Sequence, residues 1–342
     1  ERPSLGSQIA RPLRHVAALA GVVDSSIGWY PYAVRGARRI MRTWKPDLIY
    51  ASAWPVTSLC AARAVSIGAN VPWVAELRDP WAGNPYADDS PWLRGIALRQ
   101  ERRVLGSALG LVTVSQPWAQ ELRTRYGKPT AVILNGYDPE DFPSSATVPY
   151  SDGVVRITYT GQLYAGRRDP SPLFEAMRRL GPLAAKIAVT FHGPDPRLPL
   201  QLAEAYGLQA MVQATGPVPY RDALKAQCES DVLLLLTWNV PRERGFCSGK
   251  LFEYVGARRP ILLIGAEDSV SAQVVAEQGA GVVSSDPEGI AAQLESWVHQ
   301  KGSEGAIPSL PAATTDEFTR EHQARRLSDF FEDLLRTGGT PA

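Results

Sequence analysis

The sequence predicts an α/β protein with two domains, each built on a parallel sheet. Short apolar runs alternate with segments of helical periodicity along its 342 residues, a pattern typical of strands joined by crossover helices. This length exceeds what a single hydrophobic core usually serves, and a hydrophobic content of 44% suffices for full burial. A polar, proline-bearing stretch at residues 143–152 separates two series of predicted strands. We therefore expect two Rossmann-like domains joined by a short linker.

The predicted first domain covers residues 1–147, the second covers 148–315, and residues 316–342 form a C-terminal helix that packs back toward the first domain. Apolar runs of strand length, bounded by turn residues, mark the strands. In the first domain we expect strands at 48–51, 73–77, 111–114 and 131–134, and helices near 57–66, 92–105 and 117–126. In the second domain we expect strands at 156–160, 187–191, 211–214, 232–236, 261–264 and 281–283.

Residues 245–265 place glycines, a lysine and a glutamate where a loop enters a helix that leads to a buried strand. Gly245 and Gly249 let the backbone approach a ligand, the first-turn amides are expected to be unpaired, and Lys250 adds a positive charge. This junction therefore predicts a site for an anion such as a diphosphate. Glu253 lies one turn further on the same face, where its carboxylate can accept two hydroxyl hydrogens, as from a ribose. The alternative is a capped core helix with an exposed lysine and glutamate.

A second candidate site follows the buried strand 73–77. Arg78 and Asp79 come at its carboxyl end, close to Trp81, and ligands of α/β folds bind at this edge of the sheet. Asp79 is a candidate to position or deprotonate an acceptor hydroxyl, and Arg78 is a candidate to bind an acceptor phosphate or to orient Asp79. The alternative is a structural ion pair between Arg78 and either Asp79 or Glu76.

Basic residues gather at the front of the chain. Residues 1–147 contain 17 Lys and Arg against 12 Asp and Glu, a balance of +5, and the remaining 19 against 23 give −4. Five cations of the front segment are predicted on one helix: Arg35, Arg38, Arg39, Arg42 and Lys45. Such a helix can lie on anionic lipid head groups or meet a phosphate-bearing acceptor, and the alternative is an ordinary solvated face. Nucleic acid is not expected, because aromatic residues are not interleaved with these cations.

Other features argue against several classes of protein. No apolar run approaches the roughly 18 residues of a membrane span. Cys60, Cys228 and Cys247 are too few for a disulfide framework, which fits a reducing cytosol, and four scattered histidines argue against a zinc site. The acidic pair Asp88-Asp89 is predicted to lie in a solvated turn rather than in a metal site.

Several motifs follow one another in the order found in one family. A strand enters a glycine turn at 155–161, and an arginine-bearing loop follows at 162–170. Further strand segments follow at 189–193, 212–219 and 230–232. The lysine and glutamate helix lies within 245–265, and a closing helix begins at 317–320. From about residue 46 to 335 the sequence resembles the GT-B glycosyltransferases of family 4. The resemblance implies two Rossmann-like domains facing a cleft, a nucleotide-sugar donor, and transfer with retention of configuration.

The resemblance also implies roles for residues of this chain. It places the donor diphosphate against Gly161, Arg167, Gly249 and Lys250, and the ribose against Glu253. It places the nucleobase near Pro217 and Val218, and the donor sugar near Gly245, Phe246, Cys247 and Ser248. A nucleotide sugar is then the co-substrate, and no metal or other cofactor is expected.

The sequence departs from the family pattern in three places. The family's Glu-x7-Glu motif keeps only Glu253, because Gly245 stands at its first position, so recognition of the sugar ring is not carried over. Gln162 and Arg167 stand where the family often has an arginine and a lysine. Residues 1–33 contain no clear counterpart of the strand that normally opens the first domain, so the first strands are expected to be missing from this sequence.

The expected function is transfer of a hexose-type sugar from a nucleotide diphosphate sugar to a hydroxyl of a bacterial polysaccharide or a lipid-linked glycan precursor. Lys250 and Arg167 would neutralise the leaving diphosphate, and Asp79 with Arg78 would handle the acceptor. We expect a cytoplasmic protein with peripheral contact to an anionic membrane. Two alternatives stay open: a GT-B epimerase or phosphorylase using the same pocket, and a catalytically silent subunit that binds sugar nucleotides.

Overall fold

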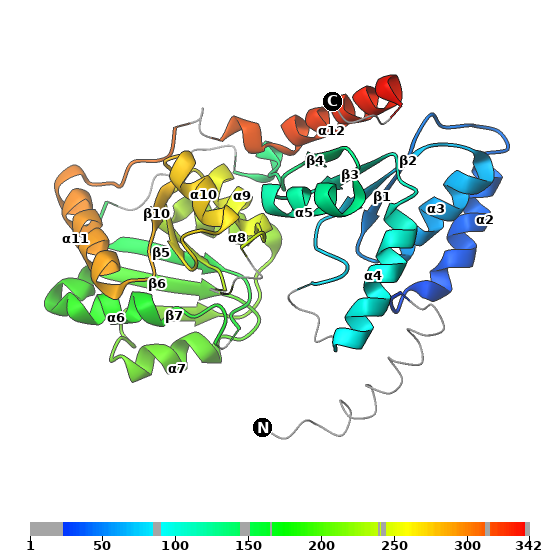
Figure 1. The fold of residues 1–342 in the computed structure, drawn as a ribbon. Coiled ribbons are helices and arrows are strands. Elements are labelled where there is room, and N and C mark those ends of the chain that lie inside the picture. Colours follow the sequence, from blue (N-terminus) through cyan, green and yellow to red (C-terminus); the bar gives the residue numbers. More distant parts are fainter. Residues whose placement is uncertain are drawn as a thin grey trace. The chain divides into compact units, whose positions relative to one another are not determined.

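The structure, a computed structural model, describes residues 23–84, 90–143, 151–164, 166–238, 240, 244–311 and 315–338. Most of the segment expected to lack a strand, the Asp88-Asp89 pair and most of the predicted linker lie outside these residues. The chain divides into two units, Glu1–Leu134 with Arg325–Ala342, and Asn135–Ala324. Each unit contains a parallel sheet accompanied by helices (Figure 1). The prediction of an α/β protein with two Rossmann-like domains is confirmed.

The sheet of the first unit has, among the described residues, four parallel strands in the order β1-β2-β3-β4. They are β1(Ile49–Ala53), β2(Trp73–Leu77), β3(Gly110–Thr113) and β4(Thr130–Val132), so the predicted strands of this domain are confirmed. Within the described part of this unit the helices are α2(Tyr30–Ile40), α3(Thr57–Ala69), α4(Pro91–Leu105), α5(Gln116–Tyr126) and most of α12(Arg320–Thr337). The basic helix is shorter than predicted. It ends at Ile40, so Arg42 and Lys45, which were predicted on it, follow the helix instead.

Both faces of β2 are buried, and this packing fixes the position of the strand end that Arg78 and Asp79 follow. Trp73 and Leu77 join a core formed with α3, α4 and α5. On the opposite face Val74 packs with Leu334 of α12. The Leu334 side chain fills the space that a Cβ at Gly110 would need, so a glycine at the start of β3 allows α12 to pack on the sheet.

The boundaries of the two units differ from those in the sequence. The predicted limits were 147 and 315, whereas the chain changes unit after Leu134 and again after Ala324. Residues just after Leu134 belong to the second unit because Tyr137 exchanges backbone hydrogen bonds with Phe318 (3.0 Å) and Arg320 (2.8 Å). This pairing of two distant segments left no mark in the local sequence pattern.

The second unit contains a six-stranded parallel sheet in the order β10-β9-β8-β5-β6-β7 among its described residues. The strands are β5(Val155–Thr160), β6(Ile187–His192), β7(Val212–Thr215), β8(Val232–Leu236), β9(Ile261–Ile264) and β10(Gly281–Val283), as predicted. The helices are α6(Ser171–Arg179), α7(Arg197–Ala205), α8(Tyr220–Glu229), α9(Gly249–Gly256), α10(Val270–Glu277) and α11(Pro287–Glu304). The chain runs outward from β5 to β7 and then returns to β8 on the other side of β5. Parallel sheets bind ligands at such a reversal, beyond the carboxyl ends of the strands.

The pairing of β5 with β8 is secured by a buried charge pair at the opposite, amino end of these strands. The Asp231 carboxylate accepts a hydrogen bond from the Arg156 amide at 2.8 Å and pairs with Lys301 of α11 at 2.5 Å. Both charged side chains are fully buried. Burying two charges is costly, so the pair fixes the position of the two strands and the helix more than it adds to stability.

Candidate functional site

Lys250 lies over the glycine turn at the end of β5, in the second unit. Gly161 has a φ of 123°, a conformation that side chains disfavour, and a Cβ at this position would collide with the Lys250 Nζ and Cε atoms. Glycine is therefore required both for the turn and for the path of the lysine. The sequence predicted Gly161 and Lys250 as parts of one site, and the structure brings them into contact.

The ammonium group of Lys250 is held by an aromatic residue. Its Nζ donates to the Tyr159 hydroxyl at 3.2 Å and lies 4.6 Å from the centre of the Tyr159 ring. Among the described residues Lys250 forms no ion pair. Burial, and to a smaller extent the charge of Arg168, lowers the pKa of Lys250 to about 8, against the opposing charge of Glu253. A partly buried cation without a carboxylate partner can be stabilised by a bound anion.

The start of α9 differs from the expectation that its first amides are unpaired. The Ser248 side chain accepts from the Lys250 amide at 3.4 Å, and the Leu251 amide donates to the Ser248 carbonyl at 3.1 Å. The expectation was therefore wrong for these two amides, because the serine before Gly249 caps its own helix. Gly249 itself is exposed at the start of the helix.

Glu253 is half-buried one turn after Lys250, and a glutamine orients it. Gln227 Nε2 donates to Glu253 Oε2 at 3.4 Å and to Thr160 Oγ1 at 3.0 Å, which ties α8 and α9 to the end of β5. Burial raises the pKa of Glu253, while the Gln227 hydrogen bond and the charge of Lys250 lower it. The sequence analysis missed Gln227, which no motif distinguishes from other helix residues.

The predicted nucleobase residues precede α8. Pro217 is exposed and Val218 half-buried, in the loop between β7 and α8. The next helix begins with the exposed Tyr220, whose hydroxyl donates to Asp141 Oδ2 at 3.5 Å. Burial raises the pKa of Tyr220, and the charges of Glu253 and Asp141 raise it further, so its hydroxyl lies within the field of the glutamate.

Two arginines, Arg167 and Arg168, follow Gly161 in the same loop. Arg167, predicted at the diphosphate, is exposed and its guanidinium lies 4.3 Å from the Trp238 ring centre. The charge of Arg168, which the sequence analysis did not select, lowers the pKa of Lys250, and its guanidinium lies 5.1 Å from the centre of the Tyr164 ring. The Lys250 ammonium is thus within the field of a second cation.

The loop before α9 is anchored through its backbone. Asn135 Nδ2 donates to the Cys247 carbonyl at 3.3 Å, and Ser271 Oγ donates to the Phe246 carbonyl at 3.4 Å. Gly245 and Cys247 are buried, and Ser248 is half-buried. Burial raises the pKa of the Cys247 thiol to about 12, so it is a packing residue and not a reactive thiol. The described residues contain no cluster of three or more His, Cys, Asp and Glu side chains suited to a metal.

In the first unit, Arg78 and Asp79 follow β2 directly. Arg78 Nη1 pairs with Glu76 Oε1 at 2.8 Å, which realises one of the structural ion pairs considered from the sequence. Burial raises the pKa of Asp79, and the charge of Arg78 lowers it. Arg78 therefore has a fixed place beside the Asp79 carboxyl through its pair with Glu76.

Comparison with known proteins finds likeness in sequence for part of the chain and likeness in fold for most of it. The family model described as Glycosyltransferase Family 4 matches residues 3–141. A glycogen synthase of Mycobacterium tuberculosis (strain CDC 1551 / Oshkosh) is 29% identical over 150 residues, which are 41% of this chain and 34% of that enzyme, so the match spans about a third of its length.

Solved structures extend the likeness over both units. Sucrose-phosphate synthase from Thermosynechococcus elongatus has a TM-score of 0.62 at 15% identity, over 92% of this chain and 80% of its own. Anabaena HepE in complex with UDP and glucose has a TM-score of 0.64 at 16% identity, over 90% and 83%. The chain has the GT-B fold, and residues 3–141 match the model of glycosyltransferase family 4. The residues assigned above to the donor lie in the second unit.

We predict that Lys250→Ala weakens binding of the nucleoside diphosphate far more than binding of the nucleoside. A charge-assisted hydrogen bond to phosphate is worth about 1.5–3 kcal/mol, or roughly 10- to 150-fold in affinity. Titration calorimetry with UDP and uridine, and with GDP and guanosine, measures both losses. Glu253→Gln is the matched control on the same helix, because it should weaken nucleoside and diphosphate alike. Equal losses for Lys250→Ala would remove the lysine from the phosphate site.

The affinity for a nucleotide sugar should fall as the pH rises above 8. Lys250 has a pKa lowered to about 8, so it is charged below that pH and neutral above it. The diphosphate of a nucleotide sugar is esterified at both ends and does not titrate there, so the dissociation constant should rise by up to about tenfold per pH unit. Calorimetry with UDP-glucose and GDP-mannose at pH 7, 8 and 9 tests this. Lys250→Ala should remove the dependence, and an unchanged dependence in that variant would assign it to another group.

Proposed function

We propose that the chain transfers a hexose-type sugar from a nucleotide diphosphate sugar to a hydroxyl of a bacterial polysaccharide or a lipid-linked glycan precursor, with retention of configuration. The observation that carries this proposal is the position of Lys250, a half-buried cation that lies against Gly161 and shares a helix face with Glu253. One group suits the phosphates and the other suits the ribose hydroxyls. Both lie at the sheet reversal where parallel folds bind ligands.

On the donor side the protein compensates the charge of the leaving group. The bond between the anomeric carbon and the diphosphate oxygen breaks, and its electron pair remains on the nucleoside diphosphate. Lys250 and Arg168, whose charges act on each other, would neutralise that charge, and Arg167 can add a contact from its place on Trp238. Glu253, oriented by Gln227, holds the ribose. The donor complexes solved for similar folds, such as HepE with UDP and glucose, favour a UDP-sugar as the first donor to test.

On the acceptor side Asp79 receives or orients the proton of the attacking hydroxyl. Burial raises its pKa, which makes its carboxylate a stronger base than an exposed aspartate. Arg78, tied to Glu76 at 2.8 Å, opposes the rise in the pKa of the Asp79 carboxyl and is a candidate to contact an acceptor phosphate.

Incubation with a panel of labelled UDP- and GDP-hexoses, with and without a glycan-lipid extract as acceptor, tests the function. Transfer to the extract, or slow hydrolysis of one donor, supports the proposal. Two alternatives give different results. Tight donor binding without turnover would indicate a silent subunit, a reading encouraged by Gly245 at a position where the family has a glutamate. Interconversion of the sugar on the nucleotide would indicate an epimerase.

Asp79→Asn should lower the turnover of sugar transfer about 10²-fold or more, the usual scale for loss of a general base, with the affinity for the donor nearly unchanged. Initial rates at saturating donor, together with donor calorimetry, separate the two quantities. A variant that transfers at the normal rate would show that Asp79 has a structural role.

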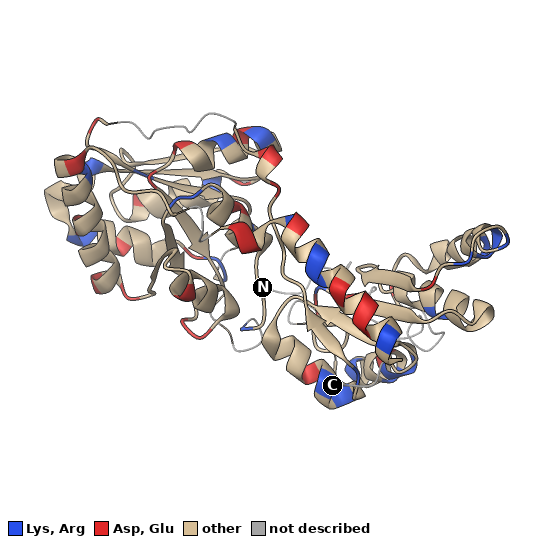
Figure 2. Ribbon diagram, turned by 90° about the horizontal axis from the view of Figure 1, so that it is seen from above, with Lys and Arg blue, Asp and Glu red and all other residues tan. Residues whose placement is uncertain are grey.

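We also propose that the first unit rests on an anionic membrane surface, which suits a lipid-linked acceptor. No helix among the described residues is long and apolar enough to cross a bilayer. Five exposed cations lie on or just after α2, some of the basic residues coloured in Figure 2: Arg35, Arg38, Arg39, Arg42 and Lys45. Trp29 and Trp44, at the two ends of this segment, are exposed, and tryptophan favours the membrane interface.

Vesicle sedimentation should show binding to anionic but not to neutral vesicles at low salt, with release as salt rises. Each cation near such a surface contributes about 1 kcal/mol, and this attraction is screened over a Debye length. Replacing Arg35, Arg39 and Arg42 with glutamine should abolish sedimentation. Replacing the exposed Arg178, Arg179 and Arg197 of the second unit in the same way is the control. Equal binding to both kinds of vesicle would leave α2 as a solvated helix.

A further inference from the structure

Glu101 is a buried carboxylate to which the proposed reaction assigns no task. It lies on α4 with an exposure of 1%. A carboxylate in such a place is costly unless its oxygens are hydrogen-bonded, so its partners indicate what it does.

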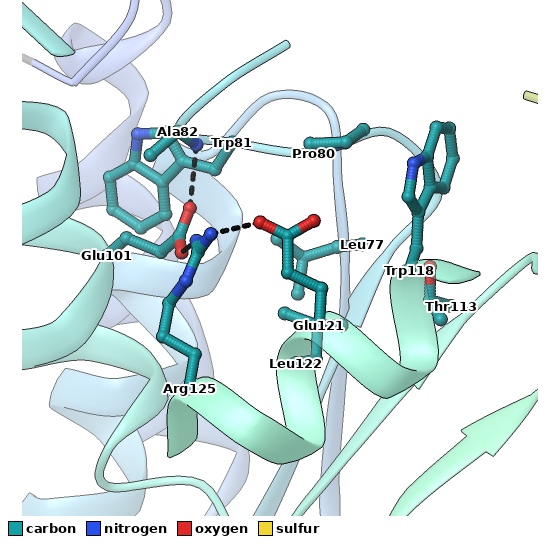
Figure 3. Close-up of a pocket in the computed structure, with 10 residues that line it drawn as sticks. All are labelled: Leu77, Pro80, Trp81, Ala82, Glu101, Thr113, Trp118, Glu121, Leu122 and Arg125. Atoms are coloured by element: carbon teal, nitrogen blue, oxygen red, sulfur yellow. Dashed lines mark hydrogen bonds and ion pairs between the residues drawn. The ribbon is translucent and has the colours of Figure 1, made fainter. Parts of the chain in front are cut away.

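The two oxygens of Glu101 face two different parts of the first unit (Figure 3). Oε2 accepts from the backbone amide of Ala82 at 2.6 Å, in the loop that follows β2. Oε1 accepts from Arg125 Nη1 at 2.7 Å and from the Tyr126 hydroxyl, both at the end of α5. Arg125 also pairs with Glu121, which is itself exposed. The carboxylate therefore joins the loop to α4 and α5.

The loop held in this way is the one that carries Asp79. Ala82 follows Asp79 by three residues, and Trp81 and Ala82 are 5% and 4% exposed. Pro80, Trp81 and Leu77 line, together with Glu101, a cavity of only about 20 Å³, so the inner part of the loop is closely packed. Asp79 itself is half-buried. The loop is anchored at β2 on one side and at Ala82 on the other, with Asp79 between the anchors.

We propose that Glu101 is a positioning residue for sugar transfer: its hydrogen bond to the Ala82 amide holds residues 78–82 in the conformation that presents the Asp79 carboxyl to the acceptor. This inference rests on the proposed role of Asp79. Arg125 and Tyr126 satisfy the charge of Glu101 so that the second oxygen is free to hold the loop.

Glu101→Gln tests this with little change of shape. The remaining carbonyl oxygen of the amide can still accept from Arg125 and Tyr126, whereas its NH2 group faces the Ala82 amide, donor against donor. Glu121→Gln is the matched control, because it makes the same chemical change in the same cluster without touching the loop. Melting temperatures identify the folded variants. If Glu101→Gln does not fold, Glu101→Asp, one methylene shorter, withdraws the oxygen from Ala82 and keeps the charge.

Three measurements are expected to change together in Glu101→Gln and to stay unchanged in Glu121→Gln. Hydrogen exchange of the Ala82 amide becomes faster. The turnover of sugar transfer, measured with the hexose donor that the wild-type chain uses, falls at least tenfold, while the KM for that donor is unchanged. The acid limb of the pH profile of turnover, which Asp79→Asn should remove, moves to lower pH, because a released loop hydrates Asp79 and so lowers its raised pKa.

Unchanged exchange at Ala82 in folded Glu101→Gln overturns the inference. So does faster exchange with normal turnover and an unmoved acid limb, which would leave Glu101 with a structural role only. If the wild-type chain transfers no sugar from any donor, it is the proposed function that fails, and with it the positioning role. The exchange data then still decide whether Glu101 holds the loop.

Discussion

The second unit depends on the reversal of strand order beside β5, and one buried carboxylate secures it. The Asp231 carboxylate accepts a hydrogen bond from the Arg156 amide at 2.8 Å and pairs with the Lys301 ammonium at 2.5 Å. These contacts connect the amino ends of β5 and β8 to α11. Ser230 adds a hydrogen bond to Thr158 at 2.6 Å across the same pair of strands. With the amino ends fixed, the carboxyl ends of β5 and β8 open onto one place, and the candidate donor site lies there.

The donor site is arranged by what surrounds its charges. The Lys250 ammonium contacts the hydroxyl and the ring of Tyr159, and the charge of Arg168 acts on it as a second cation. Among the described residues no carboxylate lies at ion-pair distance from Lys250, so the positive charge is not neutralised. Glu253, one turn away, is held by a neutral amide from Gln227. Positive and negative groups on one helix thus remain available to different parts of a nucleotide, instead of neutralising each other.

The first unit contains carboxylates with different tasks, set by their partners. Glu76 forms an ion pair with Arg78 at 2.8 Å, which holds the Arg78 side chain at the end of β2. Glu101 is saturated by three donors and links two helices to a loop. Asp79 is half-buried with Arg78 beside it, and burial raises its pKa. Of the three it has the environment of a group that exchanges a proton.

Much of this protein is determined by the sequence alone. Strands and helices were predictable because apolar periodicity reports local burial, and Gly161, Lys250 and Glu253 were predictable because glycine turns and helix starts have local signatures. The unit boundary at Leu134, the contact of Arg167 with Trp238, and the hydrogen bonds of Gln227 and Glu101 were decided by tertiary structure. Each of these depends on a hydrogen bond, ring contact or charge interaction with a residue that local periodicity does not connect to it, such as Ala82 for Glu101 or Trp238 for Arg167. Periodicity records which face of an element is buried, but not which partner lies against it.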